Sequence, residues 1–116
     1  MGTTIFSSEI QKGGSEAMYK DWLANHRDGF VVNFLKNTRA QGSKSDARFT
    51  RIHRASCKHI NPLTSEVEKA GFTTGRYQKA CTLTLDDALK EGVIRTGLTS
   101  IKYCQCIHIS FILPSR

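Results

Sequence analysis

The side chains best suited to chemistry are histidines and cysteines that stand in two short groups. His53 precedes Cys57 by four positions, and Cys104 and Cys106 alternate near the other end of the chain. Thiolates and imidazoles at such spacings are typical zinc ligands. Sulfurs on one zinc lie about 3.8 Å apart, whereas residues two apart in an extended strand are separated by about 6.6 Å. A bend near Gln105 would therefore be needed to bring the second pair together. The predicted ligands of one structural zinc are His53, Cys57, Cys104 and Cys106.

Other roles stay open for these cysteines. Cys57 and Cys81 are also compatible with small buried apolar side chains, and Cys81 is the substitute if one predicted ligand is not in place. Cys57 is in addition a candidate nucleophile, because the neighbouring Arg54 and Lys58 would lower the pKa of its thiol. The sequence shows no P-loop, no dinucleotide-binding glycine pattern and no His-Glu-x-x-His motif. We therefore predict no catalytic residues, with a small cysteine-dependent enzyme as the less favoured alternative.

Positive charge is concentrated in the middle of the chain. The net charge is +7, from 17 Lys and Arg against 10 Asp and Glu. Seven of the cations and a single acid, Asp46, fall between residues 36 and 58, so this segment holds nearly the whole excess. A concentrated positive field attracts polyanions, and we predict a non-enzymatic module that binds DNA or RNA through phosphates. The predicted contact residues are Lys36, Arg39, Lys44, Arg48, Arg51, Arg54 and Lys58.

A protein-interaction or homo-oligomerisation module is the alternative function. The run from Ile107 to Leu113 is uncharged and rich in residues that favour β-structure. If it formed an exposed edge, it could pair with a second copy of the chain. The opposite hypothesis, an interior strand, is also compatible with its composition.

Three strings of residues are similar to those of a known domain. Phe30-Val31-Val32-Asn33, Ile52-His53-Arg54-Ala55-Ser56-Cys57 and Tyr77-Gln78-Lys79-Ala80-Cys81 resemble a small domain of uncharacterised bacterial proteins. This resemblance implies a bacterial source and brings no activity with it.

A more distant resemblance concerns the metal ligands. His53-x-x-x-Cys57 with a later close pair of cysteines resembles the zinc-binding domain of Ada-type DNA alkylation-repair proteins. By position, that resemblance implies the same four ligands and a domain that faces DNA. His53 stands where that family has a cysteine, and the second pair is one residue shorter. The methyl-transfer chemistry of the family is therefore not implied.

Helices are predicted where apolar residues recur at helical spacing. One begins at Ser15, a good N-cap, and ends before Gly29. A second begins after Thr84 and ends at Gly92, while Ser65 to Glu68 resembles a short capped turn. We therefore expect two to three short helices.

Strands are predicted where apolar residues run together or alternate. They cover residues 30–35, 48–54, 73–83 and 101–113, and a polar loop over 37–47 joins the first two. A chain of 116 residues has room for one domain. The predicted organisation is a flexible arm over residues 1–14 and a single α+β domain over 15–116, built on a small, mostly antiparallel sheet of about four strands.

The predicted location is the cytoplasm. No stretch approaches the roughly 20 apolar residues of a membrane helix, and residues 1–11 lack the features of a signal peptide. Reduced cysteines are the expectation in that compartment, which favours metal binding over disulfides. No membrane partner is predicted.

Overall fold

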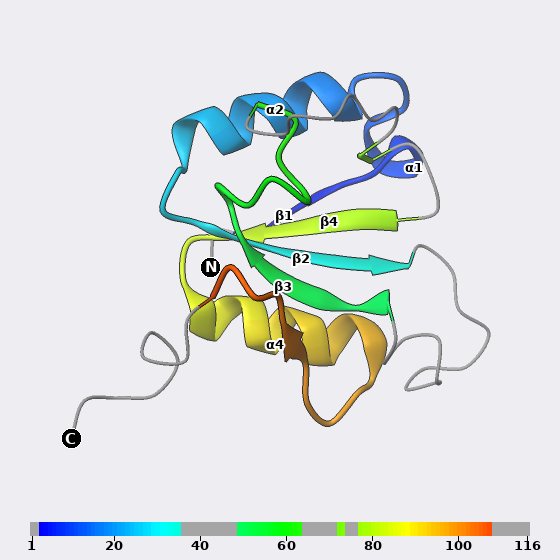
Figure 1. Ribbon diagram of the computed structural model, residues 1–116. Helices are drawn as coiled ribbons and strands as arrows, with labels where there is room; N and C mark the ends of the chain where they lie inside the picture. The colour runs from blue at the N-terminus through cyan, green and yellow to red at the C-terminus, as the bar shows by residue number, and fades with distance from the viewer. Residues whose placement is uncertain (1–2, 36–48, 64–71, 74–76, 108–116) are drawn as a thin grey trace.

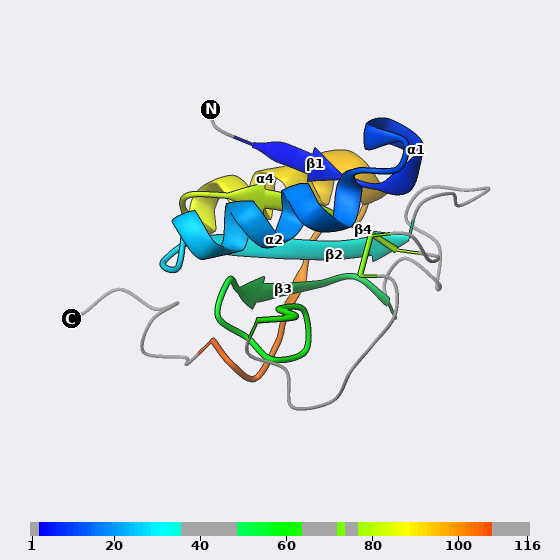
Figure 2. The same ribbon diagram turned by 90° about the horizontal axis from the view of Figure 1, so that it is seen from above.

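A five-stranded mixed sheet forms the centre of the molecule. The computed structural model describes residues 3–35, 49–63, 72–73 and 77–107. The strands are β1 (Thr4–Phe6), β2 (Phe30–Leu35), β3 (Arg51–Arg54), β4 (Tyr77–Thr82) and β5 (Lys102–Tyr103). Their order in the sheet is β1-β4-β2-β3-β5, and all neighbours are antiparallel except β3 and β5. Figure 2 shows the first four of these strands side by side. The predicted α+β class is confirmed.

Helices cover both faces of this sheet. Helix α2 (Ser15–Asn25) lies on one face and α4 (Leu85–Thr96) on the other, while the short α1 (Ser8–Gln11) precedes α2 (Figure 1). Both faces of β2 are therefore buried, as its apolar sequence predicts. Among the described residues, no helix has the length and apolar character needed to cross a membrane.

The register of the strands decides which residues face α2. Val31 pairs with Cys81 on one side and with His53 on the other, so the three side chains share a face. They belong to the layer that packs against Tyr19 and Trp22 of α2. This register places His53 at the end of a buried apolar row.

Helix α4 begins as predicted but ends later. The Thr84 hydroxyl accepts a hydrogen bond from the Asp87 N–H at 3.1 Å, which confirms the N-cap. The predicted end at Gly92 is wrong, because the helix continues to Thr96 and Gly97 supplies the left-handed cap with φ 74°. Gly92 instead lies against Ile101, where an added Cβ would come within 2.7 Å of Cγ1.

Helix α2 differs from its prediction at the first residue. Gly14 occupies the N-cap position, and no side chain caps the helix there. The Ser15 hydroxyl instead accepts a hydrogen bond from the Thr73 hydroxyl at 2.7 Å. The Ser15 side chain, which the local pattern assigns to capping, therefore makes a tertiary contact with Thr73 instead.

The N-terminal residues that the sequence analysis assigns to a flexible arm include a strand and a helix. Strand β1 pairs with residues 79–81 of β4, and Phe6 is 3% exposed against Tyr19, with ring centroids 5.8 Å apart. The Ser7 hydroxyl then caps α1 by accepting from the Glu9 N–H. Pairing with the edge of β4 and burial of Phe6 therefore position residues 4–11 on the sheet.

The C-terminal strand is shorter than predicted. Strand β5 covers only Lys102–Tyr103, and the chain turns over residues 104–107. The strand expected over 101–113 is therefore wrong in its described part. Residues 108–113, with most of the edge expected to pair with a second copy, lie outside the described residues, as do the loop over 37–47 and the turn at 65–68.

Gly29 allows the close approach of α2 and β2. A Cβ at this position would lie 2.6 Å from the Trp22 ring and 2.9 Å from the Thr82 carbonyl oxygen. We expect Gly29→Ala to lower the free energy of unfolding by about 2–3 kcal/mol because the ring must shift. Urea unfolding measures this. Gly14→Ala is the control, since its Cβ would meet nothing closer than 3.7 Å, and a loss as large there would contradict the packing argument.

Candidate metal centre

The four predicted ligands lie together at the β3–β5 edge of the sheet. One donor atom from each of His53, Cys57, Cys104 and Cys106 lies within 4.8 Å of the others. The Cys57 and Cys104 sulfurs are 3.8 Å apart, which is about the separation of two thiolates on one tetrahedral zinc. A small contraction of the cluster would therefore place all four donors around one ion.

Two short turns bring these residues together. His53 lies on β3, and the chain reverses immediately after that strand, where the Cys57 N–H donates to the Arg54 carbonyl at 2.9 Å. The first ligand pair is thus fixed by the end of a strand and the turn that follows it.

The second pair lies in the turn after β5. The Cys104 N–H donates to the Ile52 carbonyl at 2.8 Å, which ties this segment to β3. The Ile107 N–H then donates to the Cys104 carbonyl at 3.0 Å and closes the turn. The bend expected near Gln105 is therefore confirmed, and it carries Cys106 back toward the first pair.

A backbone amide supports one of the sulfurs. The Arg54 N–H donates to the Cys106 sulfur at 3.3 Å. Hydrogen bonds of this kind stabilise a thiolate and orient it toward a metal. The same turn that positions Cys57 thus also prepares Cys106 for coordination.

His53 has the protonation state that a metal requires. Burial lowers the pKa of its imidazole to about 4, and the charges of His59, Lys79 and Arg51 act in the same direction. The ring is therefore neutral at physiological pH, which is the form that ligates metals. Its Nδ1 is buried and has no hydrogen-bond partner among the described residues. A metal ion or a proton donor would supply the interaction that this buried nitrogen lacks.

Burial makes Cys57 and Cys106 poor nucleophiles, because it raises the pKa of each thiol. Burial raises the pKa of Cys57 to about 12, an effect that a hydrogen bond from the His59 backbone only partly offsets. The expectation that Arg54 and Lys58 lower the pKa of this thiol is therefore wrong, because the loss of hydration on burial is the largest effect. Burial also raises the pKa of Cys106. A bound metal ion removes the proton from such thiols by direct coordination.

Cys81 lies outside the cluster. It is fully buried on β4, and Val31 of β2 separates it from His53 in the sheet. Burial among apolar side chains raises its pKa as well. Cys81, the predicted substitute ligand, is therefore a small buried core residue, in agreement with the alternative prediction for this cysteine.

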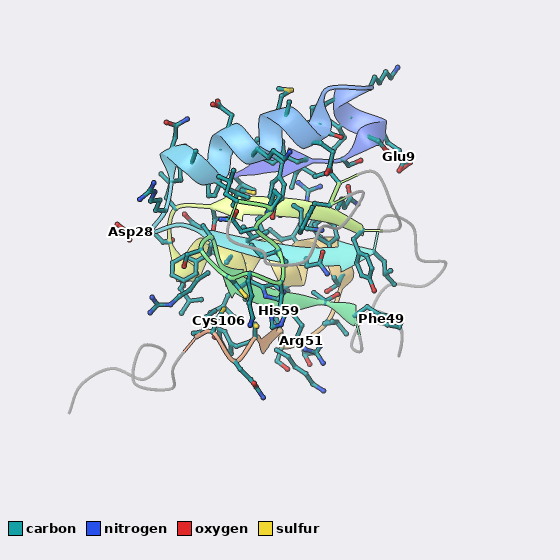
Figure 3. The ribbon with its side chains drawn as sticks, turned by 45° about the horizontal axis from the view of Figure 1, so that its top comes forward. Glu9, Asp28, Phe49, Arg51, His59 and Cys106 are labelled. Carbon is teal, nitrogen blue, oxygen red and sulfur yellow. The ribbon has the colours of Figure 1, made fainter. Side chains whose placement is uncertain are left out.

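His59 is a donor that the predicted ligand set omits. Its Nδ1 lies 3.5 Å from the Cys57 sulfur and 3.7 Å from the Cys104 sulfur. Figure 3 shows His59, Cys106 and Arg51 at the same edge of the sheet. The spacing Cys57-x-His59 points to this contact once a turn after β3 is recognised.

The described part of the predicted cationic surface lies around the same edge. Arg51 and Arg54 are half-buried on β3, and Lys58 is exposed in the following turn. Lys102 on β5 was not among the predicted contacts, yet it is exposed and stands opposite Arg51 in the sheet. Residues 49–63 and 101–107 contain these four cations and no Asp or Glu. The remaining predicted contacts, Lys36, Arg39, Lys44 and Arg48, lie outside the described residues.

Comparison of the chain with protein-family models, with curated proteins and with solved structures found no significant match.

Proposed function

We propose that this protein is a small non-enzymatic module that binds nucleic acid through phosphate contacts and whose β3–β5 edge is held by a structural zinc. The observation that carries the proposal is the close cluster of one imidazole and three thiols within two described segments, 49–63 and 101–107, that contain four cations and no Asp or Glu. In the sequence, the cluster of metal-binding side chains and the concentration of cations are independent features. Their meeting at one edge links metal binding to the presentation of positive charge.

The donor set supports zinc in a structural role. Three sulfurs and one neutral imidazole nitrogen are the ligands that zinc prefers, and four protein donors close its tetrahedral shell. The cluster joins the turn after β3 to the turn after β5, and β5 itself contributes only two paired residues. An ion would therefore fix a connection that few hydrogen bonds otherwise make.

The distribution of charge supports a polyanionic partner. Lys58 and Lys102 are exposed on the two segments that the cluster joins, and Arg51 pairs with Lys102 in the sheet. Side chains of this type position a phosphate backbone without reading its bases. The DNA-facing role implied by the resemblance to Ada-type zinc domains agrees with this assignment.

Binding of short DNA and RNA duplexes at two salt concentrations tests the proposal. With about four phosphate contacts, counterion release gives a log–log slope of about −3.6 on duplex DNA, so affinity should fall roughly 150-fold between about 50 and 200 mM salt. Fluorescence anisotropy measures the affinity, and elemental analysis after chelator-free purification measures the zinc. Weak binding that salt does not change would overturn the assignment of a phosphate-binding surface.

A further inference from the structure

The metal cluster has more donors than a tetrahedral ion can use. His53, Cys57, Cys104 and Cys106 already number four, and His59 brings a fifth donor against two of the sulfurs. A nitrogen and a sulfur on the same zinc are about 3.6 Å apart when the bonds are about 2.05 and 2.3 Å long. The two distances from His59, 3.5 and 3.7 Å, match this value. The His59 Nδ1 therefore lies at the separation from these two sulfurs that a shared zinc would require.

The two histidines occupy different surroundings. His53 is 6% exposed and its backbone is held in β3 by pairing with Val31 of β2. His59 is exposed and lies in the turn after Cys57, so its ring can rotate without disturbing the core. The two rings are 6.4 Å apart in an edge-to-face arrangement. Both imidazoles thus flank the same thiols, one from the core and one from the surface.

We propose that His59 is a second imidazole ligand of the metal centre, which exchanges with His53 for the fourth position beside the three cysteines. The inference rests on the proposed function only in that a metal is bound at this cluster. The cysteines remain fixed, the buried histidine holds the ion in its closed state, and the exposed one holds it when that position opens to solvent. His53 and His59 therefore exchange while the three cysteines keep the ion bound.

A double-mutant cycle on zinc affinity tests this exchange. The variants are His53→Ala, His59→Ala and the double variant, with His26→Ala as the matched control because its ring stacks on Trp22 at the end of α2. Zinc affinity is measured by competition with a chromophoric chelator. Because either imidazole fills the same position, at most one single variant can lose more than about twofold in affinity. We expect the larger loss in His53→Ala, which removes the buried ligand, and a loss in the double variant that far exceeds the product of the two single losses. His26→Ala should bind zinc as the wild type does.

Coordination is observed directly in the unmutated protein, so the test does not depend on the folding of the His53 variant. Nitrogen chemical shifts of the imidazole rings, recorded with and without zinc, should report coordination at both His53 and His59. The Co²⁺ form of each single variant should keep the intense visible bands of a tetrahedral site.

Three results would overturn the exchange: an unaltered affinity in His59→Ala with no zinc effect on its ring, an unaltered affinity in His53→Ala, or losses that simply multiply. If instead the wild type bound neither zinc nor Co²⁺, the metal centre itself would be wrong, and the failure would be that of the proposed function.

Discussion

Removal of zinc is expected to lower the midpoint of thermal unfolding by on the order of 10–20 °C. The unfolded chain cannot hold the donors together, since the cluster joins residues 53–57 to residues 104–106. Zinc therefore binds the folded state, and at about 1,000 times its Kd it adds about 4 kcal/mol to the free energy of unfolding. A domain of this size gains roughly 3–6 °C for each kcal/mol. Differential scanning calorimetry of the metal-free and zinc-loaded protein measures the shift.

Two cysteine variants separate metal binding from general loss of packing. Cys104→Ala removes a donor that is only half-buried, whereas Cys81→Ala removes a thiol from the core outside the cluster. We expect zinc to raise the midpoint of Cys81→Ala by as much as that of the wild type, although from a lower starting value. The zinc-dependent shift of Cys104→Ala should be lost or greatly reduced. An equal shift in both variants, or none in the wild type, would contradict a structural zinc at this site.

The cluster of His53, Cys57, Cys104 and Cys106 could be predicted from the sequence because the chemistry of its members restricts the alternatives. Few histidines and cysteines are present, and tetrahedral zinc geometry forbids a straight strand through Cys104 and Cys106. That argument requires a bend near Gln105, and the structure contains it. The bend that such a site requires is therefore present, whereas the strand that the alternating pattern favoured over 101–113 is absent from most of its described part.

Elements defined by local patterns were also predictable. The apolar run of β2 and the Thr84 cap of α4 each specify their element without help from distant residues. The three residues of β1 do not, because they form a strand only against β4. The parallel pairing of β5 with β3 is likewise a property of the assembled sheet.

Two errors show where local patterns compete with tertiary packing. Gly92 and Gly97 both follow a helical stripe, but only Gly97 adopts the left-handed conformation that ends α4. Gly92 is needed inside the helix because the Ile101 side chain lies against it. His59 was missed as a donor for a related reason, since its contact with Cys104 joins residues far apart in the chain. Sequence spacing indicates the local contact of His59 with Cys57 but not the contact with Cys104.

Reversal of two charges at the β3–β5 edge is expected to weaken nucleic-acid binding at least tenfold at about 100 mM salt. Lys58→Glu/Lys102→Glu is the informative variant because both side chains are exposed. Arg51 and Arg54 are less suitable, since they are half-buried in β3, beside the cluster. Each lysine that meets a phosphate contributes about 1 to the log–log salt slope, so the slope should become shallower by about 2.

A matched double variant distinguishes a local surface from net charge. Lys20→Glu/Lys90→Glu makes the same change in net charge on α2 and α4, and the exposed pair of Lys90 with Asp86 that it breaks contributes little to stability. If the β3–β5 edge binds the phosphates, this control should leave the salt slope nearly unchanged. Equal losses in both variants would mean that net charge governs binding and that the edge has no special part. Because zinc is proposed to fix that edge, chelation should also reduce the difference between the two variants, which ties the metal centre to the binding surface in one measurement.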